Sequence, residues 1–212
     1  MTVLKRRGLL IVFEGTDGTG KSTQHQLLGE YLQKNHYPVI STREPTDGAF
    51  GAKIRQLYTN RTMFSPEEEL KLFLDDRKQH VEELIAPALK KGEVVLCDRY
   101  FLSTAAYQGA AGFDPETILR QNNFAPDPDL ALLFQAPLQT GSERIVHGRG
   151  ETLNDFEQLD TLKKVAEIFS SLNRPYIQTI DATGSIKTVH ALVLQHVLPL
   201  LETFPSSHRI KQ

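Results

Sequence analysis

Cysteine is nearly absent from this sequence, and the residues that build metal clusters are not grouped. Cys97 is the single cysteine, which excludes an internal disulfide framework and leaves no cysteine-rich metal site. Because it lies in an apolar run, we expect a buried structural thiol rather than a reactive one. The seven histidines are scattered without an H-x-x-x-H or Cys-His grouping, so we expect no structural zinc.

Long apolar runs and an excess of one charge are also missing. The basic residues at 5–7 precede only five apolar residues before Glu14, too few for a signal-peptide core or a membrane span. We therefore expect a cytoplasmic protein without a membrane partner. With 24 basic and 26 acidic residues the net charge is -2, so the composition does not indicate a nucleic-acid partner. The 212 residues fit one α/β domain, residues 1–212, with a frayed tail at 205–212.

The most informative segment is a glycine-rich loop between a strand pattern and a helix pattern. Residues 9–13 suit a strand buried on both faces, and residues 15–22 match G-x-x-x-x-G-K-[ST] in full. The glycines let backbone N–H groups point at phosphate oxygens, and the following helix adds its positive N-terminal end. We expect Lys21 to reach the β- and γ-phosphates and the Ser22 hydroxyl to bind Mg²⁺. The candidate ATP-binding residues are Gly15, Thr16, Asp17, Gly18, Thr19, Gly20, Lys21, Ser22 and Thr23.

A glycine turn without a ligand is the alternative interpretation, and the flanking strand and helix argue against it. The loop does not identify a reaction, because the same motif serves kinases, switches and motors. No nucleophile elbow or Cys-His pair is present, which favours phosphoryl transfer, a reaction that needs positioned cations and metal more than a nucleophile on the protein.

Strand patterns alternate with helix patterns along the chain. This order predicts an α/β fold of the P-loop NTPase type, a three-layer α/β/α arrangement around a five-stranded, mainly parallel sheet. Ser65 and Pro66 mark the start of a long helix, which we expect to bend near Pro87. The expected strands are 9–13, 39–42, 93–97, 130–134 and 176–180, and the expected helices include 24–34, 51–59, 66–91, 115–122, 155–172 and 186–204, with another opening at 103.

Asp98 and Arg99 follow the third expected strand, at the edge where an α/β sheet places its ligand loops. A carboxylate there suits a second Mg²⁺-positioning group, and Arg99 can hold a phosphate through two parallel hydrogen bonds. An Asp–Arg pair in a surface turn is the alternative.

A second group of candidates lies on helices. Phe73 and Arg77 are four residues apart, so they share a helix face. Taken alone, core packing for Phe73 and a solvated cation for Arg77 are the favoured interpretations. Thr104, Tyr107 and Gln108 have helical spacing and can converge on one pocket.

In this order the motifs resemble those of the thymidylate kinases. The resemblance implies phosphoryl transfer from Mg-ATP to dTMP, giving ADP and dTDP for dTTP synthesis, in line and without an intermediate on the protein. It also implies a homodimer. One matching segment is weak evidence, whereas six in order are specific. The six segments are Phe13–Ser22, Thr42–Pro45, Leu72–Arg77, Asp98–Tyr100, Ser103–Gly109 and Asp181–Thr183.

The resemblance assigns residues to the sugar and phosphate of dTMP. Asp17 is implied to contact the deoxyribose 3′-hydroxyl, and Tyr107 to lie against the sugar and disfavour a 2′-hydroxyl. Arg99 is implied to hold the acceptor phosphate, while Glu44 and Asp98 order cations and water around it.

The same resemblance assigns residues to the base. Phe73 is implied to stack on thymine, which supplies roughly 1–3 kcal/mol per base. Arg77, Thr104 and Gln108 are implied to read the base edge, with Arg55 as a further candidate.

The segment at 141–157 departs from the pattern of the family at its lid. Family members with a basic residue in the phosphate loop can dispense with a lid arginine, but here that position is Gly18, so the lid must provide the charge. The usual lid motif, Asp-Arg followed two residues later by Glu, is missing. We expect Arg149 to be the lid cation, with Arg144 as the second candidate.

Two alternatives to dTMP phosphorylation remain. The first is a related nucleoside monophosphate kinase for dUMP or UMP, because one methyl group discriminates by only about 1–3 kcal/mol in an apolar pocket. The second is a nucleotide-binding module with weak catalysis. A switch GTPase is disfavoured because no Asn-Lys-x-Asp motif is present.

Overall fold

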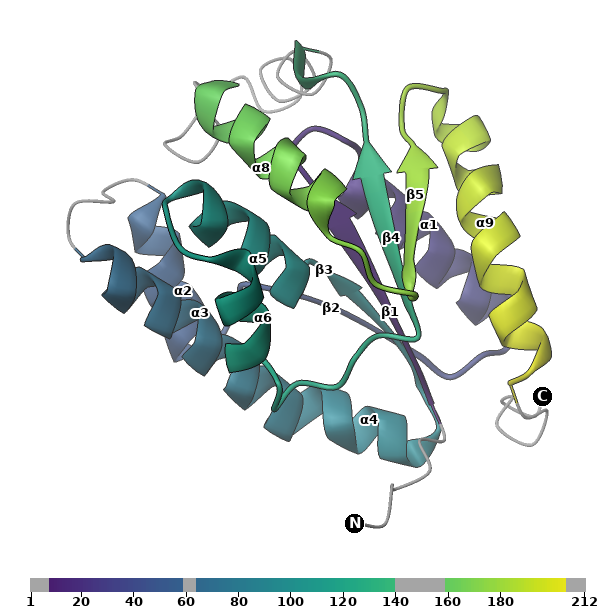
Figure 1. The fold of residues 1–212 in the computed structure, drawn as a ribbon. Helices are drawn as coiled ribbons and strands as arrows, with labels where there is room; N and C mark the ends of the chain where they lie inside the picture. The colour runs from purple at the N-terminus through teal and green to yellow at the C-terminus, as the bar shows by residue number, and fades with distance from the viewer. Residues whose placement is uncertain (1–7, 59–63, 140–158, 205–212) are drawn as a thin grey trace.

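The computed structural model describes residues 8–58, 64–139 and 159–204. Its centre is a sheet of five parallel strands in the order β2-β3-β1-β4-β5 (Figure 1). This confirms the expected P-loop NTPase-like architecture, and every ladder of the sheet is parallel. The strands are β1 (Leu9–Gly15), β2 (Val39–Arg43), β3 (Val94–Asp98), β4 (Leu130–Gln135) and β5 (Ile177–Asp181).

Helices pack on both faces of the sheet. Within the described ranges, no helix combines the length and the apolar character needed to cross a bilayer. The helices are α1 (Lys21–Lys34), α2 (Ala49–Leu57), α3 (Pro66–His80), the π-helix η2 (Val81–Ile85), α4 (Ala86–Lys91), α5 (Phe101–Ala110), α6 (Pro115–Gln121), α8 (Leu159–Ser171) and α9 (Ile186–Glu202).

The long helix expected at 66–91 is three consecutive segments. Its start is as predicted, because the Ser65 hydroxyl accepts a hydrogen bond from the Glu68 N–H and the Glu68 carboxylate accepts one from the Ser65 N–H. The expected bend near Pro87 takes the form of a π-helical turn, η2, directly before α4. Pro87 has no N–H to donate, so the carbonyl four residues before it loses its helical partner and the ladder is perturbed there.

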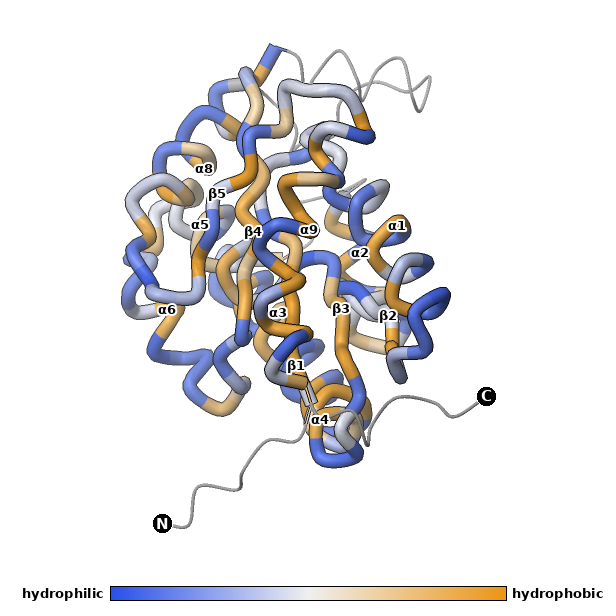
Figure 2. Tube along the Cα trace, turned by 90° about the vertical axis from the view of Figure 1, so that its right-hand side faces the viewer, coloured by the Kyte–Doolittle hydropathy of each residue, from blue (hydrophilic) through white to orange (hydrophobic). Residues whose placement is uncertain are grey.

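Two apolar cores lie on opposite faces of the sheet. Successive residues of β1 alternate, so that Leu10 and Val12 face the core formed with η2, α4, α5 and α8, whereas Ile11 and Phe13 face the core formed with α1 and α9. Figure 1 shows the corresponding helices on either side of the strands, and Figure 2 shows hydrophobic residues along β3 and β4. Because both faces are covered, the strands have nearly continuous apolar sequences.

The parallel arrangement brings the carboxyl ends of all strands to one edge. In the register of the sheet, Asp98 lies beside both Phe13 and Arg43. The Arg99 N–H donates to the Phe13 carbonyl at 2.9 Å, and the Glu44 N–H donates to the Asp98 carbonyl at 3.0 Å. The phosphate loop and the segments after β2 and β3 therefore meet at this edge.

Candidate active site

The phosphate loop joins β1 to α1 in a conformation that depends on glycine. Gly15 has φ of 131°, and a Cβ there would lie 2.3 Å from the Phe134 carbonyl oxygen of β4. Gly20, directly before α1, has φ of 86°. A side chain is sterically excluded at the first position and conformationally strained at the second, as a loop that curls closely around phosphate oxygens requires.

Lys21 is held against the loop. Its Nζ donates to the Thr16 carbonyl at 2.7 Å, and the Thr19 hydroxyl donates to the same oxygen at 2.8 Å. Burial, followed by the nearby Arg99 charge, lowers the pKa of Lys21 to about 8. At neutral pH the ammonium is therefore mostly protonated and can balance phosphate charge.

Ser22 and Asp98, the two residues expected to bind Mg²⁺, are in direct contact. The Ser22 hydroxyl donates to Asp98 Oδ2 at 2.5 Å. The other carboxylate oxygen, Asp98 Oδ1, is buried and accepts no hydrogen bond from any residue that the structure describes. A hydroxyl and a carboxylate oxygen are ligands that Mg²⁺ accepts, so these two residues fit the ion.

Arg99 connects the end of β3 to the phosphate loop. Its guanidinium donates to Asp17 Oδ1 at 2.6 Å, to the Gly15 carbonyl at 3.2 Å and to the Ser103 hydroxyl at 3.1 Å. The other oxygen of Asp17 accepts from the Tyr107 hydroxyl at 2.9 Å, and Arg99 lies 5.3 Å from the centroid of the Tyr107 ring. Burial acts to raise the pKa of Asp17, but the charges of Arg99 and Lys21 hold it well below its usual range.

Glu14, the next-to-last residue of strand β1, supports this group. One of its oxygens accepts from the Tyr100 N–H at 2.9 Å, and the other accepts a short hydrogen bond from the Ser103 hydroxyl. Burial raises the pKa of Glu14 to about 7, although the Ser103 hydrogen bond and the Arg99 charge act in the opposite direction. Ser103 therefore links a buried carboxyl group to the guanidinium of Arg99.

Arg77 is 1% exposed, unlike the solvated cation that its helix alone indicates. Its guanidinium donates to Glu44 at 2.5 Å, to Asn122 at 2.7 Å and to the Thr104 hydroxyl at 3.0 Å. It also lies 5.4 Å from the centroid of the Tyr100 ring. Three segments that are distant from Arg77 in sequence thus fix this side chain, because Tyr100 and Thr104 both belong to the start of α5.

Glu44 lies in the turn after β2 and is also buried. Its second oxygen is 3.0 Å from His80 Nδ1, and His80 Nε2 is 2.8 Å from the Thr42 hydroxyl. The resemblance assigned Glu44 to cations and water around the acceptor phosphate, whereas here both of its oxygens bind protein groups. Glu44 therefore holds both Arg77 and His80, and its assignment to cations and water around the phosphate stays a prediction.

The fold brings Cys97 close to Glu44 and His80, with potential ligand atoms within 4.8 Å of one another. Each of these atoms is engaged, because the Cys97 thiol donates to the Arg99 carbonyl at 3.0 Å and the others bind as described above. Burial raises the pKa of the Cys97 thiol well above its ordinary value, and Glu44 and Asp98 add to the effect. The prediction of a buried thiol is confirmed.

Phe73 and Arg55 border the outer part of the site. Phe73 packs beside the small apolar cluster of Ile54, Leu57 and Leu72. Arg55 donates to the Thr46 carbonyl at 2.7 Å. Gln108, on α5, is fully buried, and its amide donates to Glu69 of α3 at 2.6 Å.

The phosphate loop, Arg99 and Arg77 border one cavity of about 550 Å³. Its walls come from the phosphate loop, the turn after β2, and helices α2, α3 and α5. The cavity includes Lys21, Ser22 and Asp98 together with all nine candidates for acceptor binding, which are Asp17, Glu44, Arg55, Phe73, Arg77, Arg99, Thr104, Tyr107 and Gln108.

Other sequence-based predictions fall outside the part of the chain that the structure describes. These are the lid at 141–157 with its candidates Arg149 and Arg144, and the tail at 205–212.

Four contributors to the site were not predicted. Glu69 had a usable signal, since it precedes Phe73 by four residues and Arg77 by eight on one helix face. Glu14 and His80 had weaker signals, as polar residues beside recognised motifs. Asn122, after α6, had none, because only the folded chain brings it to Arg77.

Comparisons with known proteins agree with this geometry. A family model described as Thymidylate kinase matches residues 13–193. A thymidylate kinase of Desulfotalea psychrophila is 55% identical over 195 residues, which cover 92% of this chain and 96% of that protein. A thymidylate kinase of Xanthomonas campestris pv. campestris is 44% identical, and the match covers 88% of this chain and 83% of that protein. One of Xylella fastidiosa is 43% identical, and the match covers 92% of this chain and 88% of that protein. The similarity spans every element that lines the cavity.

Proposed function

The chain belongs to the thymidylate kinase family, and we propose that the cavity at the carboxyl edge of its sheet is where it transfers a phosphoryl group from ATP to dTMP. The protein is a kinase that converts ATP and dTMP into ADP and dTDP. The single observation that carries the assignment of the site is that the phosphate loop and the nine candidate acceptor-binding residues border one cavity.

The ATP phosphates bind the loop from Gly15 to Thr23. Lys21, which already lies against the loop, exchanges its contact with the Thr16 carbonyl for the β- and γ-phosphates. Ser22 and Asp98 would hold Mg²⁺, and the bound ion would neutralise charge on the transferred group. The free Oδ1 of Asp98 supports this role, since no described residue occupies it.

The acceptor binds on the side of α3 and α5. Arg99 holds the dTMP phosphate, and its present contacts with Asp17 and Ser103 orient the guanidinium for that purpose. Asp17 and Tyr107 border the sugar. Phe73 stacks on the base, and Arg77 and Gln108 meet its polar edge, with Thr104 and Arg55 beside them.

The reaction needs no nucleophile from the protein. An oxygen of the dTMP phosphate forms a bond to the γ-phosphorus of ATP while the bond to the β,γ-bridging oxygen breaks, and ADP leaves with the bonding electrons. The protein supplies alignment and positive charge, and we assign the cation at the transferred group to Arg149, with Arg144 second.

Three further properties belong to the proposal. The chain acts as one domain in which residues 141–157 form the lid. The protein is a homodimer, by resemblance to its family. It works in the cytoplasm, where its two nucleotide substrates are found.

A coupled assay of ADP release tests the acceptor. Mg-ATP is supplied with dTMP, dUMP, UMP, CMP, dGMP or AMP in turn, and we expect the highest kcat/KM with dTMP. A preference for dUMP or UMP would identify a related kinase instead. No turnover with any acceptor, while dTMP still raises the melting temperature, would show that the cavity binds nucleotide but lacks catalysis.

A further inference from the structure

Two residues that line the acceptor side of the cavity each have a buried polar atom with no hydrogen-bond partner among the described residues. One atom is Gln108 Oε1, a hydrogen-bond acceptor, and the other is Arg77 Nε, a donor. Gln108 is 0% exposed and Arg77 is 1% exposed, so neither atom is satisfied by bulk water. A buried polar atom without a partner is unfavourable, and because both residues line the cavity, a bound base is the group that could supply the missing partners.

The orientation of the Gln108 amide is set by Glu69. Gln108 Nε2 donates to Glu69 Oε1 at 2.6 Å, and Glu69 is 2% exposed. A carboxylate only accepts hydrogen bonds, so it binds the NH₂ end of an amide and repels the carbonyl end. Rotating the amide by half a turn would place two oxygens at that distance in a buried site, which is unfavourable. The carbonyl oxygen of Gln108 must therefore be the atom left for a ligand.

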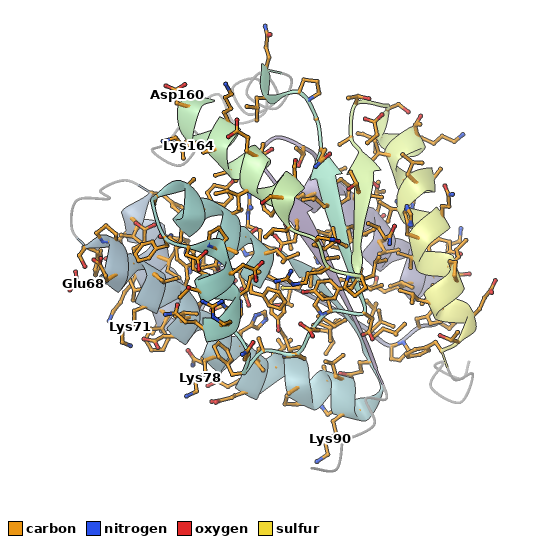
Figure 3. The ribbon with its side chains drawn as sticks, in the orientation of Figure 1. Glu68, Lys71, Lys78, Lys90, Asp160 and Lys164 are labelled. Carbon is orange, nitrogen blue, oxygen red and sulfur yellow. The ribbon has the colours of Figure 1, made fainter. Side chains whose placement is uncertain are left out.

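Glu69 differs from the neighbouring acidic residues because it is buried and contacts Gln108. The three acidic residues in the first turn of α3 are Glu67, Glu68 and Glu69. Glu67 and Glu68 are exposed, and Figure 3 shows Glu68 pointing away from the fold. The favourable interaction of a carboxylate with a helix N-terminus accounts for all three, but it does not require that one of them be buried. Glu69 alone reaches α5 among these three.

We propose that Glu69 is a positioning residue that makes the cavity select a pyrimidine with an N–H at ring position 3. Thymine and uracil carry that N–H beside the C4 carbonyl, which matches an acceptor on Gln108 and a donor on Arg77. Cytosine has a bare nitrogen at position 3 and an amino group at position 4, so both contacts become repulsive. The inference rests on the proposed function, since it requires that Gln108 meet the acceptor base. It concerns the choice between imide bases and cytosine, and not between dTMP and dUMP.

The test compares kcat/KM for dTMP and dCMP in wild type, Glu69→Gln and Glu67→Gln. The amide introduced by Glu69→Gln can donate or accept, so it no longer dictates the orientation of Gln108. We expect the ratio of the two kcat/KM values to fall by about 10-fold or more. Glu67→Gln removes the same charge from the same helix end, and we expect it to leave the ratio unchanged. A role in stability alone would lower both rate constants together and would not move the ratio.

A double-mutant cycle separates action through Gln108 from a direct effect. In a Gln108→Leu background, Glu69→Gln is expected to change the ratio no further, because the group that it orients is gone. Glu69→Asp, which keeps the charge but shortens the reach, gives a second test and is expected to lower the ratio as Glu69→Gln does. An unchanged ratio in a folded Glu69→Gln or Glu69→Asp variant would overturn the proposal, as would a further fall in the Gln108→Leu background. Failure of wild type to phosphorylate dTMP would instead refute the proposed function, so the two failures are distinct.

Discussion

Asp17 of the phosphate loop and Arg99 after β3 are joined by a hydrogen bond of 2.6 Å, although 82 residues separate them in sequence. Arg99 adopts φ of 70°, a left-handed conformation that a residue with a side chain rarely occupies. The phosphate loop, which we propose binds the donor, and Arg99, which we propose binds the acceptor phosphate, are therefore coupled through one ion pair. Both members of the pair border the cavity, so its geometry affects each substrate.

Replacing Arg99 by Lys is expected to lower kcat/KM for dTMP by about 100-fold or more. The guanidinium binds Asp17, Ser103 and the Gly15 carbonyl at once, and a single ammonium cannot keep all three contacts while holding a phosphate. Steady-state kinetics with saturating Mg-ATP measures the effect. Arg120→Lys, at a 65% exposed side chain on α6, is the matched control and is expected to leave kcat/KM unchanged. A change of less than about threefold in Arg99→Lys would contradict this role.

Glu14 is expected to make the protein less stable as pH rises from about 4.5 to about 7. The folded state keeps the proton of this buried carboxyl group up to about pH 7, whereas the unfolded chain releases it near the ordinary value of 4.5. Unfolding then releases a proton in this window, so the free energy of unfolding falls with pH, by up to about 3 kcal/mol. Below about pH 4.5 the carboxyl group is protonated in both the folded and the unfolded state, so Glu14 no longer destabilises the protein.

Urea denaturation of wild type and Glu14→Gln at pH 5, 6, 7 and 8 tests this contribution. Glutamine does not titrate, so the stability of the variant relative to wild type is expected to rise with pH across this range. Other titrating groups affect both proteins alike and cancel in the difference. A difference that stays constant from pH 5 to pH 8 would show that Glu14 is ionised in the folded protein.

Arg77 is expected to be required for stability as well as for binding. Arg77→Met removes a buried cation from Glu44 and Asn122 and leaves the Glu44 carboxylate with an unbalanced charge, which is expected to reduce the free energy of unfolding by about 3–5 kcal/mol. Lys71→Met breaks a pair in the same helix whose lysine is 72% exposed, and a loss below about 1 kcal/mol is expected. Chemical denaturation compares the two. Equal losses in both variants would show that the buried network adds nothing beyond a surface pair.

The parts of this structure that the sequence predicts are those set by local patterns. The apolar run of β1, the glycine loop and the Ser65 cap each depend on residues within a few positions, and each is found as expected. The break at η2 was predicted only as a bend, because a proline disturbs the ladder without specifying how the hydrogen bonds rearrange.

The environment of Arg77 could not be predicted from local sequence patterns. Its helix alone indicates a solvated cation, and only the family resemblance placed it at a substrate. The structure buries it because Glu44, Thr104 and Asn122 arrive from three other segments. Pairings over 27 to 45 residues leave no periodic signal in the sequence. The same holds for Asn122, whose role depends entirely on the partner that the fold gives it.

A lid arginine is expected to supply the positive charge at the transferred phosphoryl group. The phosphate loop has Gly18 where a basic residue would serve, so the charge must come from elsewhere, and Arg149 is the assigned source. Arg149→Ala is expected to lower kcat by about 1000-fold or more while the affinity for dTMP is retained, because the charge acts on the transition state rather than on the bound acceptor. Single-turnover kinetics measures the chemical step, and isothermal titration measures dTMP binding. Arg144→Ala is the paired variant, with a smaller effect expected. A larger loss in Arg144→Ala would transfer the role to that residue. An unchanged kcat in both variants would mean that neither arginine acts on the transferred group and that Lys21, Arg99 and the metal supply the positive charge.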